Sequence, residues 1–349
     1  MPVPLIRPMS KRLVSLDAYR GFVMLAMVSE GLGFSHVARN FPHSSFWQFL
    51  SHEFSHASWT GCGAWDLIQP SFMFIVGVAM PYSYGARRAR GDSSGRMWGH
   101  VVSRAIALIL LGIFLRSNGY SFTRFTFEDV VTQIGLGYIF LYALLGRGVR
   151  VQSIALVVIL VGYWLLFALW PTPGPGFSSM AAGIPPDWHR FTGFAAHWNK
   201  YMNPAGYFDQ CFLNLFPWPK RWVYNGGGYQ TLSFIPSLAT MLFGLMTGEY
   251  LRREGELMPK VKRLALAGVA CLAFGFAVDG NIWPFVDWHW SIAPVVKRIW
   301  TPSWAVYSTG WTLLTLSLFL WIIDLHDYRH WAFPFIVVGM NSVAMYVMS

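Results

Sequence analysis

Long apolar segments recur along the chain and are separated by short polar stretches. A transmembrane helix needs about 20 mostly apolar residues, because each residue adds about 1.5 Å to its length. Segments that approach or reach this length lie at about residues 21–35, 66–86, 99–116, 129–146, 151–170, 231–251, 263–280, 303–324 and 333–349. We therefore expect an all-α polytopic membrane protein with about nine transmembrane helices, forming one transmembrane domain over residues 1–349. The last segment reaches Ser349 without a polar stop, so we expect the natural chain to continue beyond it.

The composition agrees with this class. Hydrophobic residues make up 54% of the chain and charged residues only 12%, with 18 tryptophans. The formal net charge of +10 would suggest a nucleic-acid partner in a soluble domain. Here the basic residues cluster between apolar segments, as the positive-inside rule expects, so we predict no nucleic-acid partner. The three cysteines, Cys62, Cys211 and Cys271, have no spacing typical of a disulfide framework or a metal site.

The distribution of Lys and Arg predicts the orientation of the chain. With a cytoplasmic N-terminus, 17 of the 26 basic residues fall on the inner side. We therefore expect an integral protein of a bacterial inner membrane with its N-terminus in the cytoplasm. This orientation places the segment from His52 to Asp66 on the outer side, together with a large loop over residues 171–230. Four tryptophans in that loop, Trp188, Trp198, Trp218 and Trp222, fit either an aromatic belt at the membrane interface or a lid that stacks on a sugar.

The segment between the first two apolar runs contains the most side chains that could act in catalysis or bind a metal. His52, Glu53 and His56 fit the pattern H-E-x-x-H, which on a helix would hold zinc with the glutamate as general base. The pattern is short, lies in a polar stretch and lacks an evident third ligand. We therefore expect no metal and keep a membrane zinc metalloprotease only as an alternative.

A second interpretation takes His56 together with Asp66. Imidazole has an ordinary pKa of about 6.5 and is a natural proton acceptor at neutral pH. Asp66, at the start of an apolar segment, would orient the ring or stabilise its charge. The structural alternatives are an interfacial histidine and a carboxylate that favours a helix N-terminus.

Other polar residues lie within the apolar segments. Glu30 interrupts the first segment, and ionisable groups inside a membrane are functional candidates, so a solute transporter that uses Glu30 is a further alternative. Gln133 lies at the start of the fourth segment, and Asn341, in the last, fits either a binding site or hydrogen bonds between helices. Arg20 lies near Asp17, with which it fits an ion pair.

The segment from Arg87 to Arg104 is the strongest basic cluster on the expected inner side. It fits contact with anionic membrane lipids and a role in topology. It also fits a phosphate-rich ligand from the cytosol, because arginine binds phosphate in a bidentate manner.

Taken together, these residues resemble the heparan-alpha-glucosaminide N-acetyltransferase family and its bacterial relatives. The matching pieces, in the family's order, are LDAYRG at 16–21, HASW at 56–59 with Gly61, DLIQP at 66–70, FIVG at 74–77, QIGLGY at 133–138, the stretch 233–248 and GMNS at 339–342. They extend over nearly the whole chain, and the set is more specific than any one piece.

The resemblance implies a transmembrane acyltransferase that takes acetyl-CoA on the cytosolic side and acetylates an amino sugar or glycan on the outer side. His56 would correspond to the family's active histidine, acting as general base or acyl carrier, with Asp66 and Glu30 as catalytic partners. The residues expected to bind the substrate are Ser58, Trp59, Gln133 and Asn341, and those expected to bind CoA phosphates are Arg20, Arg87, Arg88 and Arg104. The resemblance is compatible with a homo-oligomer.

One piece departs from the family pattern. Animal members carry an asparagine late in the first span, where this chain reads Ser29, Glu30 and Gly31. Either Glu30 acts as the polar partner of His56 in place of that asparagine, or the acceptor differs from that of the animal members.

Overall fold

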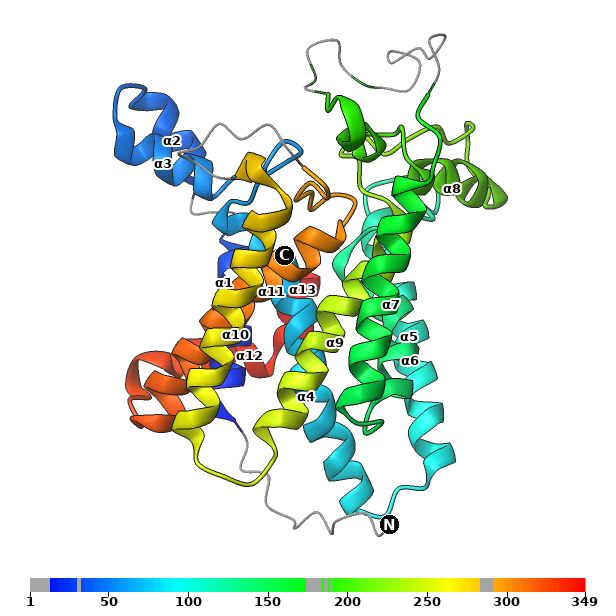
Figure 1. The fold of residues 1–349 in the computed structure, drawn as a ribbon. Helices are drawn as coiled ribbons and strands as arrows, with labels where there is room; N and C mark the ends of the chain where they lie inside the picture. The colour runs from blue at the N-terminus through cyan, green and yellow to red at the C-terminus, as the bar shows by residue number, and fades with distance from the viewer. Residues whose placement is uncertain are drawn as a thin grey trace.

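The computed structural model describes residues 13–29, 33–173, 184, 188, 190–282 and 291–348. Over these residues the chain is helical, with isolated β-bridges at Thr60–Val296 and Asp279–Ser291. The expected all-α architecture is therefore confirmed for this part of the chain (Figure 1).

Within the described residues, six helical segments are long and apolar enough to cross a membrane. They are α4 (Ile68–Ala89) with the preceding 3-10 turn η2 (Ala64–Leu67), α5 (Ser94–Ser117), α7 (Val149–Ala168), α9 (Phe234–Leu251) with η5 (Thr231–Ser233), α10 (Leu257–Val278), and α11 (Pro302–Phe319) with the π-helical turn η7 (Leu320–Leu325). These segments establish an integral membrane protein by length and composition.

The remaining three apolar runs form shorter helices, so the expected count of about nine spans is not confirmed. They give α1 (Val14–Val28), α6 (Val130–Leu144), and the pair α12 (Phe333–Met340) and α13 (Ser342–Met348), preceded by η8 (His330–Ala332). Asp129 caps α6, because its Oδ1 accepts the N–H groups of Val131 and Thr132 at 3.1 Å each. Asn341 separates α12 from α13. An apolar segment of the sequence can thus contain residues that cap or interrupt helices, and a hydropathy average does not detect them.

The long helices divide into a central and a peripheral set. About two-thirds of the most apolar window is buried in the spans that contain α4, α9 and α11 (61, 72 and 67%), against 22% in α5, α7 and α10. A helix that is apolar on all sides and little buried is suited to lipid. The central set is therefore the framework of the domain, and α5, α7 and α10 present most of their surface outward.

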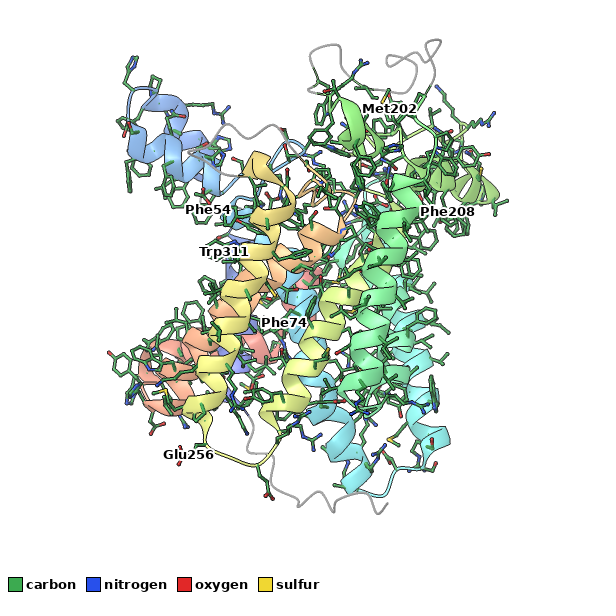
Figure 2. All side chains as sticks on the ribbon, viewed as in Figure 1. Phe54, Phe74, Met202, Phe208, Glu256 and Trp311 are labelled. Atoms are coloured by element: carbon green, nitrogen blue, oxygen red, sulfur yellow. The ribbon has the colours of Figure 1, made fainter. Side chains whose placement is uncertain are left out.

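Two of the three central helices, α4 and α9, pack against each other through glycine residues. A Cβ atom at Gly77 would overlap the Met241 carbonyl, and one at Gly244 would overlap the Phe74 carbonyl. Small residues let backbones approach closely, which is how helices associate where lipid removes the hydrophobic driving force. Phe74 accordingly lies in the middle of the helix bundle (Figure 2).

One end of the bundle carries a cap of short elements. They are α2 (Phe34–Asn40), α3 (Ser45–Glu53), η3 (Gly193–Trp198), α8 (Pro204–Phe212) and η4 (Leu213–Leu215). Figure 2 places Phe54, Met202 and Phe208 at this end and Glu256 at the opposite end, in the turn before α10. A cluster of buried apolar side chains, which includes Phe167 and Trp198, joins the cap to the helices. We refer to this as the capped end.

We predict that Gly244→Ala destabilises the fold, because its Cβ has no space against α4. Overpacking costs on the order of 1–3 kcal/mol, so the Tm in detergent should fall by several degrees. The matched control is Gly162→Ala in α7, where a Cβ meets nothing within 4 Å. That variant should unfold at the wild-type temperature or above it, since alanine favours helix. Equal Tm values for the two variants would contradict the close α4–α9 contact.

Candidate active site

The segment from Ser55 to Gly63 forms a tight loop between α3 and η2. Gly61 has φ of 102°, a conformation that favours glycine. The Glu53 Oε2 atom accepts the Ala64 N–H at 3.0 Å, and Gly61 N donates to the Val295 carbonyl at 3.2 Å. The loop is thus fixed to the end of α3 and to the connection between α10 and α11.

His56 lies in this loop and is paired with Asp66 at the start of the α4 span. His56 Nδ1 is 2.8 Å from Asp66 Oδ1, and the side chains are 43% and 1% exposed. The other carboxylate oxygen, Oδ2, accepts the N–H groups of Ala57 at 3.0 Å and Gly63 at 3.2 Å. An ionised carboxylate held in this way accepts the proton of Nδ1, which leaves Nε2 with its lone pair.

Lys297, which the sequence interpretation did not select, completes the group. Its Nζ atom lies 3.1 Å from Asp66 Oδ1 and 3.1 Å from His56 Nδ1, and its side chain is 6% exposed. A buried carboxylate requires a partner, and the ammonium supplies one. The negative and positive charges cancel, so the imidazole faces a polar pair with no net charge. We call His56, Asp66 and Lys297 the histidine cluster.

Arg298 attaches the loop of the histidine cluster to a second part of the cap. Its guanidinium donates to the Ala57 carbonyl at 3.3 Å and to the Gly227 carbonyl. It also lies 5.5 Å from the centre of the Tyr229 ring. The segment 225–229 is therefore next to the histidine cluster in space.

The other two residues of the HASW motif differ in exposure. Ser58 is exposed beside His56, while Trp59 is 4% exposed. The Trp59 indole N–H donates to the Trp198 carbonyl at 3.1 Å, and its ring packs edge-on against Trp188. Trp59 thus connects the loop to the interior of the cap, and Trp198 is fully buried rather than offered as a stacking face.

Cys62 lies close to the histidine cluster. Burial raises the pKa of its thiol, and the Asp66 carboxylate adds to that effect. The thiol therefore stays protonated near neutral pH, which does not suit a nucleophile.

The remaining residues expected to bind substrate lie elsewhere. Gln133 is 1% exposed, and its amide donates to the backbone carbonyls of Phe127 and Thr231 at 2.9 and 3.2 Å. Asn341 is exposed and donates to the Val337 carbonyl in the preceding helix, α12. The contacts of both side chains are with the backbone. Glu30 lies outside the described residues.

The predicted phosphate-binding arginines lie on three helices: Arg87 and Arg88 are in the last turn of α4, Arg104 is within α5 and Arg20 is within α1. Arg87 Nη2 lies 2.9 Å from His100 Nε2, and the Arg104 guanidinium lies 5.3 Å from the centre of the Tyr138 ring. Arg88 is exposed, whereas Arg20 pairs with Asp17 at 3.6 Å. Helix α4 is 22 residues long, a rise of roughly 33 Å, with Asp66 just before its start and Arg87 in its last turn.

The H-E-x-x-H pattern does not form a helical pair. Helix α3 ends at Glu53, and His56 follows in the loop with its Nδ1 atom on Asp66. His52 instead lies 3.3 Å from Glu53 Oε1. Over the part of the chain that the structure describes, no group of three His, Cys, Asp or Glu residues could hold a metal ion. The spacing therefore does not give the shared helix face that this motif requires.

Comparison with known proteins identifies the family. A sequence model described as heparan-alpha-glucosaminide N-acetyltransferase, catalytic, matches residues 12–224, which include His56, Asp66 and Gln133 but not Lys297. The human heparan-alpha-glucosaminide N-acetyltransferase is 24% identical over 96% of this chain and 52% of its own length. The mouse protein of the same name is 22% identical over 98% of this chain and 54% of its own length. The chain therefore spans about half the length of these relatives, and it belongs to the heparan-alpha-glucosaminide N-acetyltransferase family.

Proposed function

We propose that the protein transfers an acetyl group from acetyl-CoA, bound from the inner side, to an amino sugar or glycan on the outer side. The observation that carries this proposal is the His56–Asp66 pair, in which a buried carboxylate orients a partly exposed imidazole. Family membership supports an acetyltransferase activity, and the paired imidazole supplies the base that such a transfer requires.

In this proposal His56 Nε2 takes the proton of the acceptor. The acceptor nitrogen or oxygen forms a bond to the thioester carbonyl carbon, the carbon–sulfur bond breaks, and CoA leaves as a thiolate that the imidazolium reprotonates. The same geometry allows Nε2 to attack first and carry the acetyl group as an acetyl-imidazole. In both routes Asp66 keeps the ring in one tautomer and one orientation.

Lys297 acts in this scheme as a positioning residue. It neutralises Asp66 and holds the carboxylate where Ala57 and Gly63 also bind it. Without Lys297, Asp66 would be a buried charge with no cationic partner, and such losses cost about 3–5 kcal/mol. The orientation of the imidazole ring therefore depends on a residue that is distant in sequence.

The inner end of the bundle suits the donor. Arg87 and Arg88 lie beside the turn between α4 and α5, Arg104 lies further along α5, and guanidinium groups bind phosphates well. The CoA phosphates would bind there, and Arg20 is a further candidate. The acyl arm would extend between the helices toward the histidine cluster at the other end of α4.

We predict that His56→Ala abolishes acceptor-dependent release of CoA in proteoliposomes. General-base catalysis contributes on the order of 10²- to 10⁴-fold, so the rate should fall by at least that range. The control is His43→Ala, which changes an exposed histidine of the same cap. The proposal is wrong if His56→Ala keeps wild-type activity, or if the wild type releases no CoA with any amino sugar or glycan.

We predict that Lys297→Met lowers both the Tm and the rate. The double variant Asp66→Asn with Lys297→Met should regain much of the Tm, because neither charge is then unpaired. Its rate should remain about 10²- to 10⁴-fold below wild type, because the imidazole lacks its carboxylate. Thermal unfolding and CoA release distinguish the two effects. A Lys297→Met protein with wild-type Tm and rate would contradict the role of this residue.

We predict that the capped end faces outward. Cys211 is exposed in α8, so a membrane-impermeant maleimide should label it in intact spheroplasts and should not label Cys211→Ser. In the Cys211→Ser background, Ser94→Cys places a thiol at the opposite end, in the exposed first turn of α5. That thiol should react only after permeabilisation. The reverse pattern would invert the proposed orientation.

A further inference from the structure

A shallow groove on the capped end is separate from the histidine cluster. Its aromatic walls come from Tyr201, Trp222, Tyr224 and Tyr229, and its polar groups include Asn225 and Gln230. We call it the aromatic groove. Between its walls it has room for about one water molecule, so a larger ligand would lie across the rings rather than sink between them.

Gln230 is the unusual residue of the aromatic groove. It is 2% exposed, and neither its amide nitrogen nor its amide oxygen has a hydrogen-bond partner. A buried amide without partners costs free energy, so such a group points to a missing donor and acceptor. Its position is fixed by the backbone, because the next residue, Thr231, donates its N–H to the buried Asp209 carboxylate at 3.0 Å.

Gly206 lies next to the amide of Gln230 in the lining of the groove. A Cβ atom at Gly206 would lie 3.2 Å from Gln230 Nε2. Because Gly206 also lines the groove, a side chain at this position would cover the amide. The absence of a side chain therefore leaves a buried amide, with its donor and its acceptor both unpaired, in the lining of the groove.

The rings of the groove are held in place. Tyr201 adopts φ of 59°, an uncommon conformation for a residue with a large side chain. Its hydroxyl donates to the Asn225 carbonyl, and its ring lies 5.1 Å from that of Tyr224. The Asn225 amide in turn donates to Glu128 Oε1 at 3.2 Å. A strained tyrosine that other contacts fix is typical of a ligand site.

The aromatic groove and the histidine cluster share a wall. Arg298 binds the Ala57 carbonyl on one side and lies beside the Tyr229 ring on the other. Trp59 packs closely on Gly228, in the loop that carries Asn225 and Tyr229. A chain of sugars whose terminal ring lies at His56 would thus have the groove along its path.

We propose that the aromatic groove is a saccharide subsite, which binds a ring that follows the acetylated sugar in the acceptor chain. Sugar rings have apolar faces that stack on aromatic side chains and hydroxyls that donate and accept at once, which is what Gln230 lacks. This inference rests on the proposed function and deepens it, since it assigns the residues that would bind a second sugar ring of the acceptor.

The test compares glucosamine with a tetrasaccharide that carries the same amino sugar at its non-reducing end. Wild-type kcat/KM should be at least about ten-fold higher for the tetrasaccharide. Gly206→Ala and Gln230→Leu should each lower that preference about ten-fold, the effect of one lost hydrogen bond to a buried group. Gly95→Ala, an exposed glycine at the other end of the bundle, should keep the preference. Equal kcat/KM values for the two acceptors in the wild type would overturn the proposal.

Calorimetric titration of the tetrasaccharide without acetyl-CoA tests the subsite apart from catalysis. Binding that weakens in Gln230→Leu and in Trp222→Ala supports the subsite, even if no acetyl transfer occurs and the proposed function fails. Binding that neither variant changes, or no binding to the wild type, overturns the subsite. Trp222 is only half-buried, so this variant should fold if the buried changes do not.

Discussion

The capped end of the molecule depends on the pairing of one buried carboxylate. Asp66 is almost fully buried, and its two oxygens receive the Ala57 and Gly63 N–H groups, the His56 ring and the Lys297 ammonium. A carboxylate without such partners would be costly to remove from water. The pairing therefore joins three parts of the chain: the loop after α3, the first turn of the α4 span and the connection before α11. It also fixes the direction of the imidazole, so the fold of this loop and its proposed chemistry share one cause.

Helix α4 relates the two ends of the proposed reaction. Its first turn follows Asp66, and its last turn carries Arg87 and Arg88, roughly 33 Å away by helix rise. Its central part packs against α9 at Gly77 and Gly244, which leaves no room for side chains between the two backbones. A rigid central helix of bilayer length thus sets the separation between the basic turn and the histidine cluster. The cap covers the end that we propose to bind the acceptor, and the aromatic groove lies there beside the same loop.

The sequence was informative where the determinants are local. Apolar length predicted the helical class and α4, and the proximity of His56 and Asp66 follows from a tight turn only ten residues long. Lys297 could not be found in this way, because it lies more than two hundred residues from His56 and belongs to no motif. Trp59 and Gln133 were selected as substrate-binding residues, and the structure adds that the Trp59 indole N–H and the Gln133 amide N–H donate to backbone carbonyls, contacts that depend on tertiary packing. The expected count of about nine spans is not confirmed, because three apolar runs form shorter helices: Asp129 caps the start of α6, and Asn341 interrupts the last run between α12 and α13.

The central claim is that a thioester from one side of the membrane meets an imidazole at the other. Acetyl transfer in sealed, uniformly oriented proteoliposomes tests it directly, with acetyl-CoA supplied on one side and a membrane-impermeant amino sugar on the other. The account predicts transfer when acetyl-CoA is on the side of Arg87 and the amino sugar is on the side of His56, and none when the two are exchanged. Transfer that requires both compounds on the same side would contradict it.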